Sequence, residues 1–321
     1  MKFTAIRPIA LVLSRELLIT ALLLVGVSFV VFIILYLSPG DPFSLLLEGQ
    51  APSADAGTSV REAMGVSQTW YSRYLTWLVN MFQGNFGTSI RSGIPVLKEV
   101  YRTGLNTLFL TIGSLLVTLC ISVPVALYSA KRGMNSLSWT LTMLAYIASA
   151  LPLFWFGYLV IYFFTHKLGL FPLAFGASGS TQKYGWLYPL LPILVLGIGN
   201  GTISEVIRSL REEMSRVMAE DYIRTARAKG ASVWKHSFKE GLLIPVTEII
   251  ASKIPFILGG AVIVEQVFNW PGMGRMAWQA AQDRDYPVIM GISIFAAILV
   301  RMGSLLQSVV YVMVNPRASK E

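Results

Sequence analysis

The sequence predicts an all-α integral membrane protein with six transmembrane helices and with both termini in the cytoplasm. Three observations lead to this fold class: the composition, six long apolar stretches, and the placement of Lys and Arg. Of the 321 residues, 54% are hydrophobic and only 13% are charged, and the mean hydropathy is +0.61. A soluble domain is usually about 25% charged, so the composition is that of a membrane protein.

Six apolar stretches are each long enough to cross a bilayer, which takes about 20 residues in a helix. They cover residues 17–37, 105–129, 137–165, 187–206, 245–267 and 287–313. The first stretch follows the basic residues Lys2, Arg7 and Arg15, and the apolar region of a signal peptide also follows basic residues. It is too long for a signal peptide and has no small-residue cleavage site, so we expect an uncleaved first span.

The basic residues indicate the orientation, because Lys and Arg gather in cytoplasmic loops. With the N-terminus inside, the inner segments 1–16, 130–136, 207–244 and 314–321 hold 15 of the 26 basic residues. The outer segments are considerably longer and hold 9. The net charge of +9 is therefore a signal of topology, and a nucleic-acid partner is not needed to explain it.

The chain is expected to form one membrane domain with one outer insertion. Residues 1–37 make the N-terminal segment and first span, 38–104 the insertion, 105–313 a five-helix core, and 314–321 a cytoplasmic tail. Within the insertion, Trp70, Tyr74, Trp77, Leu78 and Met81 recur at three- and four-residue spacing, which predicts an amphipathic helix. We expect that helix to lie on the outer membrane face or to cap the bundle, where it either simply packs on the ends of the spans or also contacts the solute.

Catalytic chemistry is not indicated. The predicted topology puts His166 and His236 on opposite sides of the membrane, and the chain has no HExxH or Cys/His cluster for a metal. It also lacks the GxxxxGK[ST] motif that binds nucleotide phosphates. Cys120 lies in an apolar run and is expected to be a small buried residue. The sequence therefore predicts a non-catalytic chain with no metal or cofactor of its own.

The inner loop 207–244 is the longest and most charged inner segment, and it contains the stretch "EDYIRTARAKGAS". Asp221 is expected to cap a short helix over 222–229, which Gly230 would end at positive φ. Ser232 would cap a second helix that runs to Gly241. Because Ala226 and Ala228 are small, another surface can approach the first helix closely. On spacing alone, an ordinary amphipathic linker is an equal alternative.

The stretch "DYIRTARAKG" resembles the EAA loop of the permease subunits of bacterial ABC importers, in the dipeptide/oligopeptide/nickel group. The resemblance extends over most of the chain and rests on motifs in the same order. These are "LSPGDP", "NFGTS", "NTLFLTI", "LPLFWFG", "LGLFP", "RSLREEM", "GGAVIVEQVFNWPGMGR", "RDYPV" and "NPR". Where relatives tend to carry His and Asn after the loop helix, this chain has Ser237 and Gly241, in a stretch a few residues shorter.

The resemblance implies a type I importer permease fold in the bacterial inner membrane and a helix that couples the permease to an ATPase. The coupling residues carried over are Asp221, Tyr222, Arg224, Thr225, Ala226, Ala228, Lys229 and Gly230. The implied partners are a sister permease, two cytoplasmic ATPase subunits that bind ATP and Mg²⁺, and an outer solute-binding protein. No nucleic acid is implied.

Peptide is the substrate that the resemblance favours, and nickel or another metal chelate is the alternative. A stand-alone secondary transporter or channel is a hypothesis of a different class. It would require carboxylates in the middle of the spans that couple transport to protons or ions, and the predicted spans contain few such residues. Glu248 and Lys253 lie near the inner end of the fifth span, where snorkelling explains them.

Three residues are candidates for the lining of the translocation path: Arg301, Glu265 and Trp155. Arg301 lies midway along the sixth span, where a guanidinium costs about 2.5–3.5 kcal/mol on insertion scales. It is therefore expected to face a partner or water. Either it is structural, through an ion pair or hydrogen bonds to carbonyls of a neighbouring helix in this chain or in the sister permease, or it lines the path and attracts an anionic group of the solute.

Overall fold

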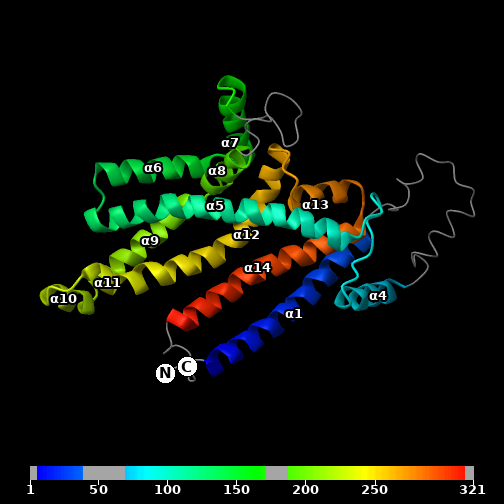
Figure 1. Cartoon of the computed structure of the whole chain (residues 1–321), viewed down its shortest axis with the longest axis horizontal. Helices are drawn as coiled ribbons and strands as arrows, with labels where there is room; N and C mark the ends of the chain where they lie inside the picture. Colours follow the sequence, from blue (N-terminus) through cyan, green and yellow to red (C-terminus); the bar gives the residue numbers. More distant parts are fainter. Residues whose placement is uncertain (1–5, 39–68, 171–186, 315–321) are drawn as a thin grey trace, which may run out of the picture. The chain divides into compact units, whose positions relative to one another are not determined.

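The computed structural model describes residues 6–38, 69–170 and 187–314 (Figure 1). Most of the first half of the outer insertion, including "SPGDP" and "APSADAGTS", lies outside the described residues, as do the end of "LGLFP" and the C-terminal "NPR". The chain forms two compact units. One is built from Met1–Leu17, Thr107–Pro271 and Val300–Glu321, and the other from Leu18–Asn106 and Gly272–Leu299.

Most helices of the first unit come from the middle of the chain. Their order is α6 (Ser136–Ala150), α7 (Leu153–Val160), the π-helix η1 (Ile161–Lys167), α8 (Leu190–Gly199), α9 (Thr202–Ala219), α10 (Asp221–Ala228), α11 (Val233–Phe238), the π-helix η3 (Lys239–Leu243) and α12 (Ile244–Val267). The unit also takes parts of α1 (Ile6–Leu37), α5 (Val96–Arg132) and α14 (Tyr286–Val314). The all-helical expectation is confirmed for the described residues.

The core of the first unit lies where α7, α8 and α12 contact one another. Its buried side chains are Leu110, Leu153, Tyr188, Leu191, Val195, Leu196, Ile257, Ala261, Val264, Phe268 and Trp270. Two rings stack on Trp270, with centroids 5.7 Å away for Tyr188 and 6.3 Å away for Phe109. Stacked aromatic pairs stabilise beyond their buried area, so this cluster fixes the ends of α8 and α12.

The second unit contains α4 (Trp70–Phe82) and α13 (Met273–Gln282), with the remaining parts of α1, α5 and α14. The predicted amphipathic helix in the insertion is confirmed by α4. It packs against α1, because the Tyr74 hydroxyl lies 3.0 Å from the Ser28 hydroxyl and the Tyr74 ring contacts Phe29 and Phe32. α4 thus packs on the first predicted span.

Three helices are long and apolar enough to cross a membrane unbroken, at Ser14–Leu37, Val96–Arg132 and Tyr286–Leu305. The other three predicted spans are pairs of helices bent at a break: Ser136–Ala150 with Leu153–Lys167 by 103°, Leu190–Gly199 with Thr202–Ala219 by 54°, and His236–Pro255 with Ile257–Val267 by 50°. The described chain therefore has three to six spans, by length and composition.

Each bend has a local cause. Leu151 precedes Pro152 and is extended, with φ −76° and ψ 135°, because proline disfavours the helical conformation in the residue before it. Gly201 sits between α8 and α9 at φ +72°, a region that glycine enters without steric cost. Pro255 lies inside α12 and removes a helix hydrogen bond. These residues are present in the predicted spans, but the apolar residues on both sides of each one led us to predict a continuous span.

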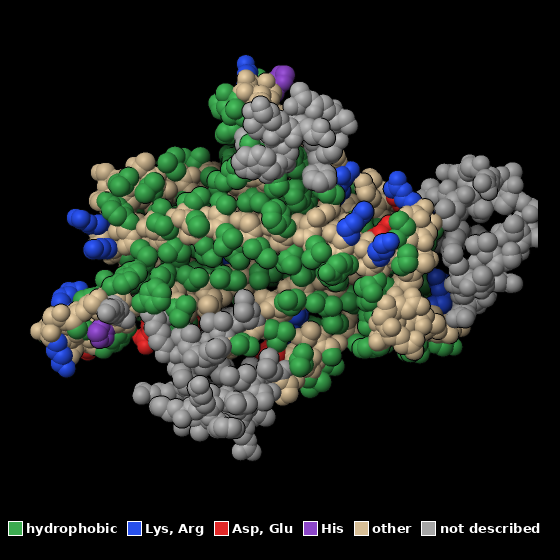
Figure 2. Space-filling model, in the orientation of Figure 1, with side chains coloured by type: hydrophobic (Ala, Val, Ile, Leu, Met, Phe, Trp, Pro, Cys, Tyr) green, Lys and Arg blue, Asp and Glu red, His purple; other side chains and the backbone are tan. Residues whose placement is uncertain are grey.

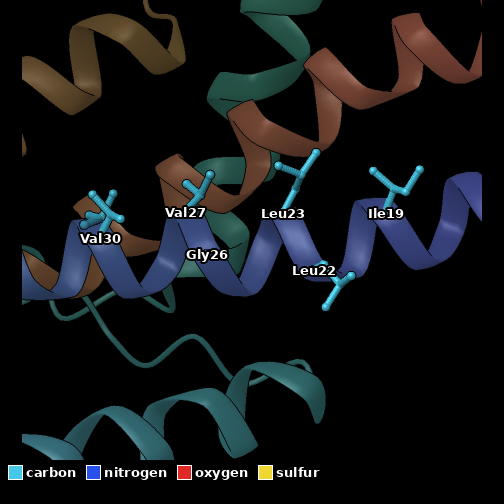
Figure 3. Close-up of a pocket in the computed structure, with 7 residues that line it drawn as sticks. Ile19, Leu22, Leu23, Gly26, Val27 and Val30 are labelled. Carbon is cyan, nitrogen blue, oxygen red and sulfur yellow. The ribbon is translucent and has the colours of Figure 1, made fainter.

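The surface is largely apolar, and Figure 2 shows hydrophobic side chains along most of the visible helix faces. α1 is the extreme case, since only 6% of its apolar window is buried. Ile19, Leu22, Leu23, Val27 and Val30 project from it around Gly26 (Figure 3). A soluble protein seldom exposes so large an apolar surface, so these faces are suited to lipid or to a second membrane subunit.

Candidate functional site

The predicted inner loop begins on α9, which has one apolar and one charged face. Its buried apolar side chains are Ile203, Val206, Ile207, Leu210, Met214 and Val217. Its exposed face carries the ion pairs Arg208–Glu212 and Arg216–Glu213. Exposed pairs of this kind add little stability, so packing holds α9 in place.

The short helix α10 follows at Asp221–Ala228, and its start differs from the prediction. Asp221 was expected to cap the helix, but it is the first helical residue, and Glu220 occupies the cap position without a side-chain cap bond. Asp221 instead accepts from the Arg224 guanidinium at 3.3 Å. In the first turn its negative charge still interacts favourably with the helix dipole. The cap prediction is wrong by one residue, because Glu220 already has the extended backbone that a cap requires.

The end of α10 is as predicted. Gly230 has φ +68°. Its N–H donates to the Arg227 carbonyl at 3.1 Å, and the Ala231 N–H donates to the Ala226 carbonyl at 2.9 Å. This pair of bonds is the Schellman motif, which satisfies the last carbonyls of a helix and reverses the chain.

The faces of α10 separate the coupling candidates into two groups. Of these candidates, Ala226 is buried, at 4% exposure, next to Ile223 at 0%, which was not a candidate; α10 contacts α9 and α11. The other candidates are exposed: Asp221, Tyr222, Arg224, Thr225, Ala228, Lys229 and Gly230. Ala226 thus allows α10 to pack closely within this chain, and Ala228 is the small residue on the outward face of α10.

The second half of the loop differs from the expected helix that ends at Gly241. α11 ends at Phe238, and the chain continues through the π-helix η3 into α12. A Cβ on Gly241 would lie 3.0 Å from the Met214 sulfur and 3.5 Å from Val217 Cβ. Gly241 therefore lets η3 lie directly against α9. This packing gives a physical reason for one of the two departures from the family pattern.

A hydrogen bond joins α10 to η3, because the Tyr222 hydroxyl donates to Glu240 Oε2 at 3.0 Å. Burial, together with this bond and the Glu240 charge, raises the pKa of Tyr222 to about 12. The phenol therefore stays a neutral donor at physiological pH. Spacing in the sequence does not reveal this contact, since its two residues lie on different elements.

Arg301, one of the three path candidates, forms an ion pair with Glu16 of α1 within the first unit. The two side chains are 17% and 20% exposed. This is the contact that the structural interpretation of Arg301 requires. Glu16 was not singled out from the sequence, and its position early in the first apolar helix was the available signal.

The other two path candidates lie in different environments. Glu265 is fully buried and accepts from the Thr107 hydroxyl at 2.6 Å, whereas Trp155 on α7 is 46% exposed. A second buried charge, Lys253, pairs with Glu205 of α9. It was expected to snorkel, but its side chain is only 7% exposed, so the ion pair accounts for it.

The comparisons with known proteins cover nearly the whole chain. Residues 122–320 match the binding-protein-dependent transport system inner membrane component, and residues 9–122 match the N-terminal part of that component. The chain belongs to this family. It is an ABC importer permease and a multi-pass protein of the inner membrane.

Three relatives show how close the similarity is. An oligopeptide transport system permease protein of Bacillus subtilis, AppB, is 37% identical over 94% of this chain and 97% of its own. A glutathione transport system permease protein of Salmonella typhimurium, GsiC, is 34% identical over 95% and 97%. A dipeptide transport system permease protein of Alkalihalophilus pseudofirmus, DppB, is 30% identical over 94% and 97%.

Proposed function

We propose that this chain is the membrane-spanning permease subunit of an ATP-driven peptide importer and forms the translocation path with a sister permease. The relatives supply the substrate class, since they are permease proteins of oligopeptide, glutathione and dipeptide transport systems. The observation that carries the coupling role is α10. This helix is closed by a Schellman motif, is supported from behind by buried Ile223 and Ala226, and exposes its other face.

In the proposed mechanism, the exposed face of α10 docks on a cytoplasmic ATPase subunit, which binds ATP and Mg²⁺. α10 is joined to α9 by packing and to η3 by the Tyr222–Glu240 bond. A displacement of α10 therefore moves the inner ends of α9 and α12 with it. ATP biases the membrane helices between inward- and outward-facing states because the closed ATPase dimer favours one of them.

The same proposal includes the topology and the partners. We take each bent helix pair as one span, which gives six spans and leaves both termini on the same side of the membrane; the distribution of Lys and Arg supports the cytoplasmic side. The exposed apolar face of α1 would then be covered by lipid and by the sister permease. A solute-binding protein would deliver the solute from outside, in keeping with the description of the family as binding-protein-dependent.

The test is uptake of labelled trialanine by cells that lack the gene, with and without the wild-type gene restored. We expect uptake only in the restored cells, and loss of it when ATP is depleted while the proton gradient is kept. Uptake that follows the proton gradient alone would indicate a secondary transporter. Restored ⁶³Ni²⁺ uptake without trialanine uptake would show that the substrate is a metal chelate.

A further inference from the structure

The outer end of the second unit carries an unusual number of basic residues. Five of the nine basic residues that the topology places outside lie in two short segments: Arg91, Lys98 and Arg102 in one, Arg275 and Arg284 in the other. The positive-inside rule disfavours such a group next to a span on the outer side. It therefore calls for a specific explanation.

The two segments meet in the structure. The Arg91 guanidinium pairs with Asp283, next to Arg284, and the Ser92 hydroxyl donates to Glu99 in the first turn of α5 at 2.9 Å. The Thr103 hydroxyl lies 3.7 Å from the Met276 sulfur, so the N-terminal parts of α5 and α13 also lie together. Figure 2 shows Lys and Arg side chains gathered over this end. We call these five basic residues the outer basic surface.

The carboxylates at this end have partners within the second unit. Asp285 is 2% exposed and accepts from the Ser89 hydroxyl and from the N–H groups of Arg91 and Val288. Asp283 and Glu99 hold the loop through the bonds already described. Lys98 and Arg102 are exposed one turn apart on α5, and neither forms an ion pair among the described residues. The charge presented outward is therefore mainly positive.

The length of α5 indicates where this surface lies. The apolar part of α5, residues 105–129, is about 37 Å long at 1.5 Å per residue, and the hydrocarbon core is about 30 Å thick. The charged first turns precede that part, so Lys98 stands about 10 Å beyond its end. Arg91 and Arg284 are on loops beyond the helix ends. Arg91, Lys98 and Arg102 are exposed, so a macromolecule on the outer face can reach them, whereas lipid headgroups would reach Arg102 first.

We propose that the outer basic surface is a docking site for an acidic face of the solute-binding protein. This rests on the proposed function, which supplies that partner. A charge-matched surface speeds association and fixes the orientation in which the partner binds. The loop that carries Arg91 is held on both sides, to Asp285 and to Glu99, so the charges are presented in a fixed arrangement.

The first experiment places p-benzoylphenylalanine at Ile94, an exposed position on this loop, and illuminates living cells. We expect an adduct with a secreted solute-binding protein, identified by mass spectrometry. The same probe at Leu75, exposed on α4, is the matched control and should give less adduct with the solute-binding protein. An adduct with phospholipid overturns the proposal. So does one with residues 39–68 of this chain, which carry four carboxylates and one arginine.

The second experiment titrates the identified protein, once purified, onto the transporter in nanodiscs at 50 and 300 mM salt. The double variant Lys98→Glu, Arg102→Glu should weaken binding about tenfold at 50 mM and much less at 300 mM, because salt screens exposed charges. Arg73→Glu on α4 is the control and should bind as the wild type does. Equal binding by the double variant at low salt, or a loss restricted to uptake of acidic peptides, overturns the proposal.

The two proposals fail in different ways. Wild-type cells that do not take up trialanine would refute the peptide-import function, even if the adduct at Ile94 forms. Normal trialanine uptake with unchanged binding of the double variant would refute the outer basic surface alone.

Discussion

The inner loop and the outer basic surface are both charged, but they present their charges differently. In the predicted inner loop, α10 is a short helix whose shape is fixed by buried Ile223, by Ala226 and by the bonds at Gly230. In the outer basic surface, a loop is held by Asp285 and Glu99 and presents basic groups. The first arrangement is suited to recognition by shape and the second to recognition by charge. Changes of backbone and volume should therefore dominate inside, and changes of charge outside.

The largest effect is expected from Gly230→Val. Valine at φ +68° is strained, because a β-branched residue rarely adopts a left-handed conformation. The two hydrogen bonds of the Schellman motif should break, and the chain after α10 should then leave in a different direction. We expect ATP-driven uptake to fall at least tenfold. The matched control is Gly133→Val, since Gly133 has φ +70° in the short loop between α5 and α6. If both variants lose uptake equally, backbone strain alone explains the loss, and α10 has no special role.

A somewhat smaller effect is expected from Ala228→Trp, which adds volume on the outward face of α10. The permease should insert normally but retain several-fold less ATPase subunit when it is purified. Ala226→Trp adds the same volume on the buried face, where overpacking costs about 1–3 kcal/mol. It should lower the thermal stability of the permease itself. The same loss of the ATPase from both variants, with no change in stability, would contradict the assignment of the two faces.

The ion pair of Arg301 lies outside both charged regions and shows what a buried charge requires. Arg301→Gln removes the positive charge that pairs with the Glu16 carboxylate. The yield of the purified transporter complex should therefore fall several-fold, and uptake of all peptides should fall equally. The double variant Arg301→Gln, Glu16→Gln should recover part of the yield, because removal of both partners costs less than removal of one. Selective loss of acidic peptides at normal yield would instead assign Arg301 to the path.

The smallest effect is expected from Tyr222→Phe, which deletes one hydrogen bond worth about 0.5–1.5 kcal/mol. Uptake per ATP hydrolysed should fall about twofold or more, while the ATPase still co-purifies. The Tyr222 pKa is raised to about 12, above its value of about 10 in the unfolded chain. The stabilisation from the neutral phenol is therefore complete below pH 10 and is lost only as the pH rises toward 12. Between pH 6 and 9, uptake should not depend on this group.

How far the sequence predicts the structure differs between elements. The all-helical class, the helix in the insertion and the positive φ of Gly230 followed from apolar periodicity and from the properties of glycine. The bends at Pro152, Gly201 and Pro255 were not expected, because apolar content predicts a span but not its direction. The first residue of α10 was missed by one position, which is the usual uncertainty at helix ends.

The contacts between distant residues could not be predicted from the sequence. The pairs Tyr222–Glu240, Glu16–Arg301 and Thr107–Glu265 each join different helices, and one sequence carries no signal of which helices become neighbours. The burial of Ala226 was also missed. A small residue on a short helix can serve contact with the chain itself or with a partner, and only packing decides between them.

The pairing of Glu16 with Arg301 joins the first long helix of the chain to the last, and this has a consequence for biogenesis. α1 (Ile6–Leu37) precedes α14 (Tyr286–Val314) in the chain, so α1 enters the membrane first. Until α14 reaches α1, the Arg301 guanidinium disfavours insertion of α14 by about 2.5–3.5 kcal/mol. Stable insertion of α14 therefore depends on a carboxylate in a helix that is made before it. A chain that loses its first helix should leave its last one exposed to quality-control proteases.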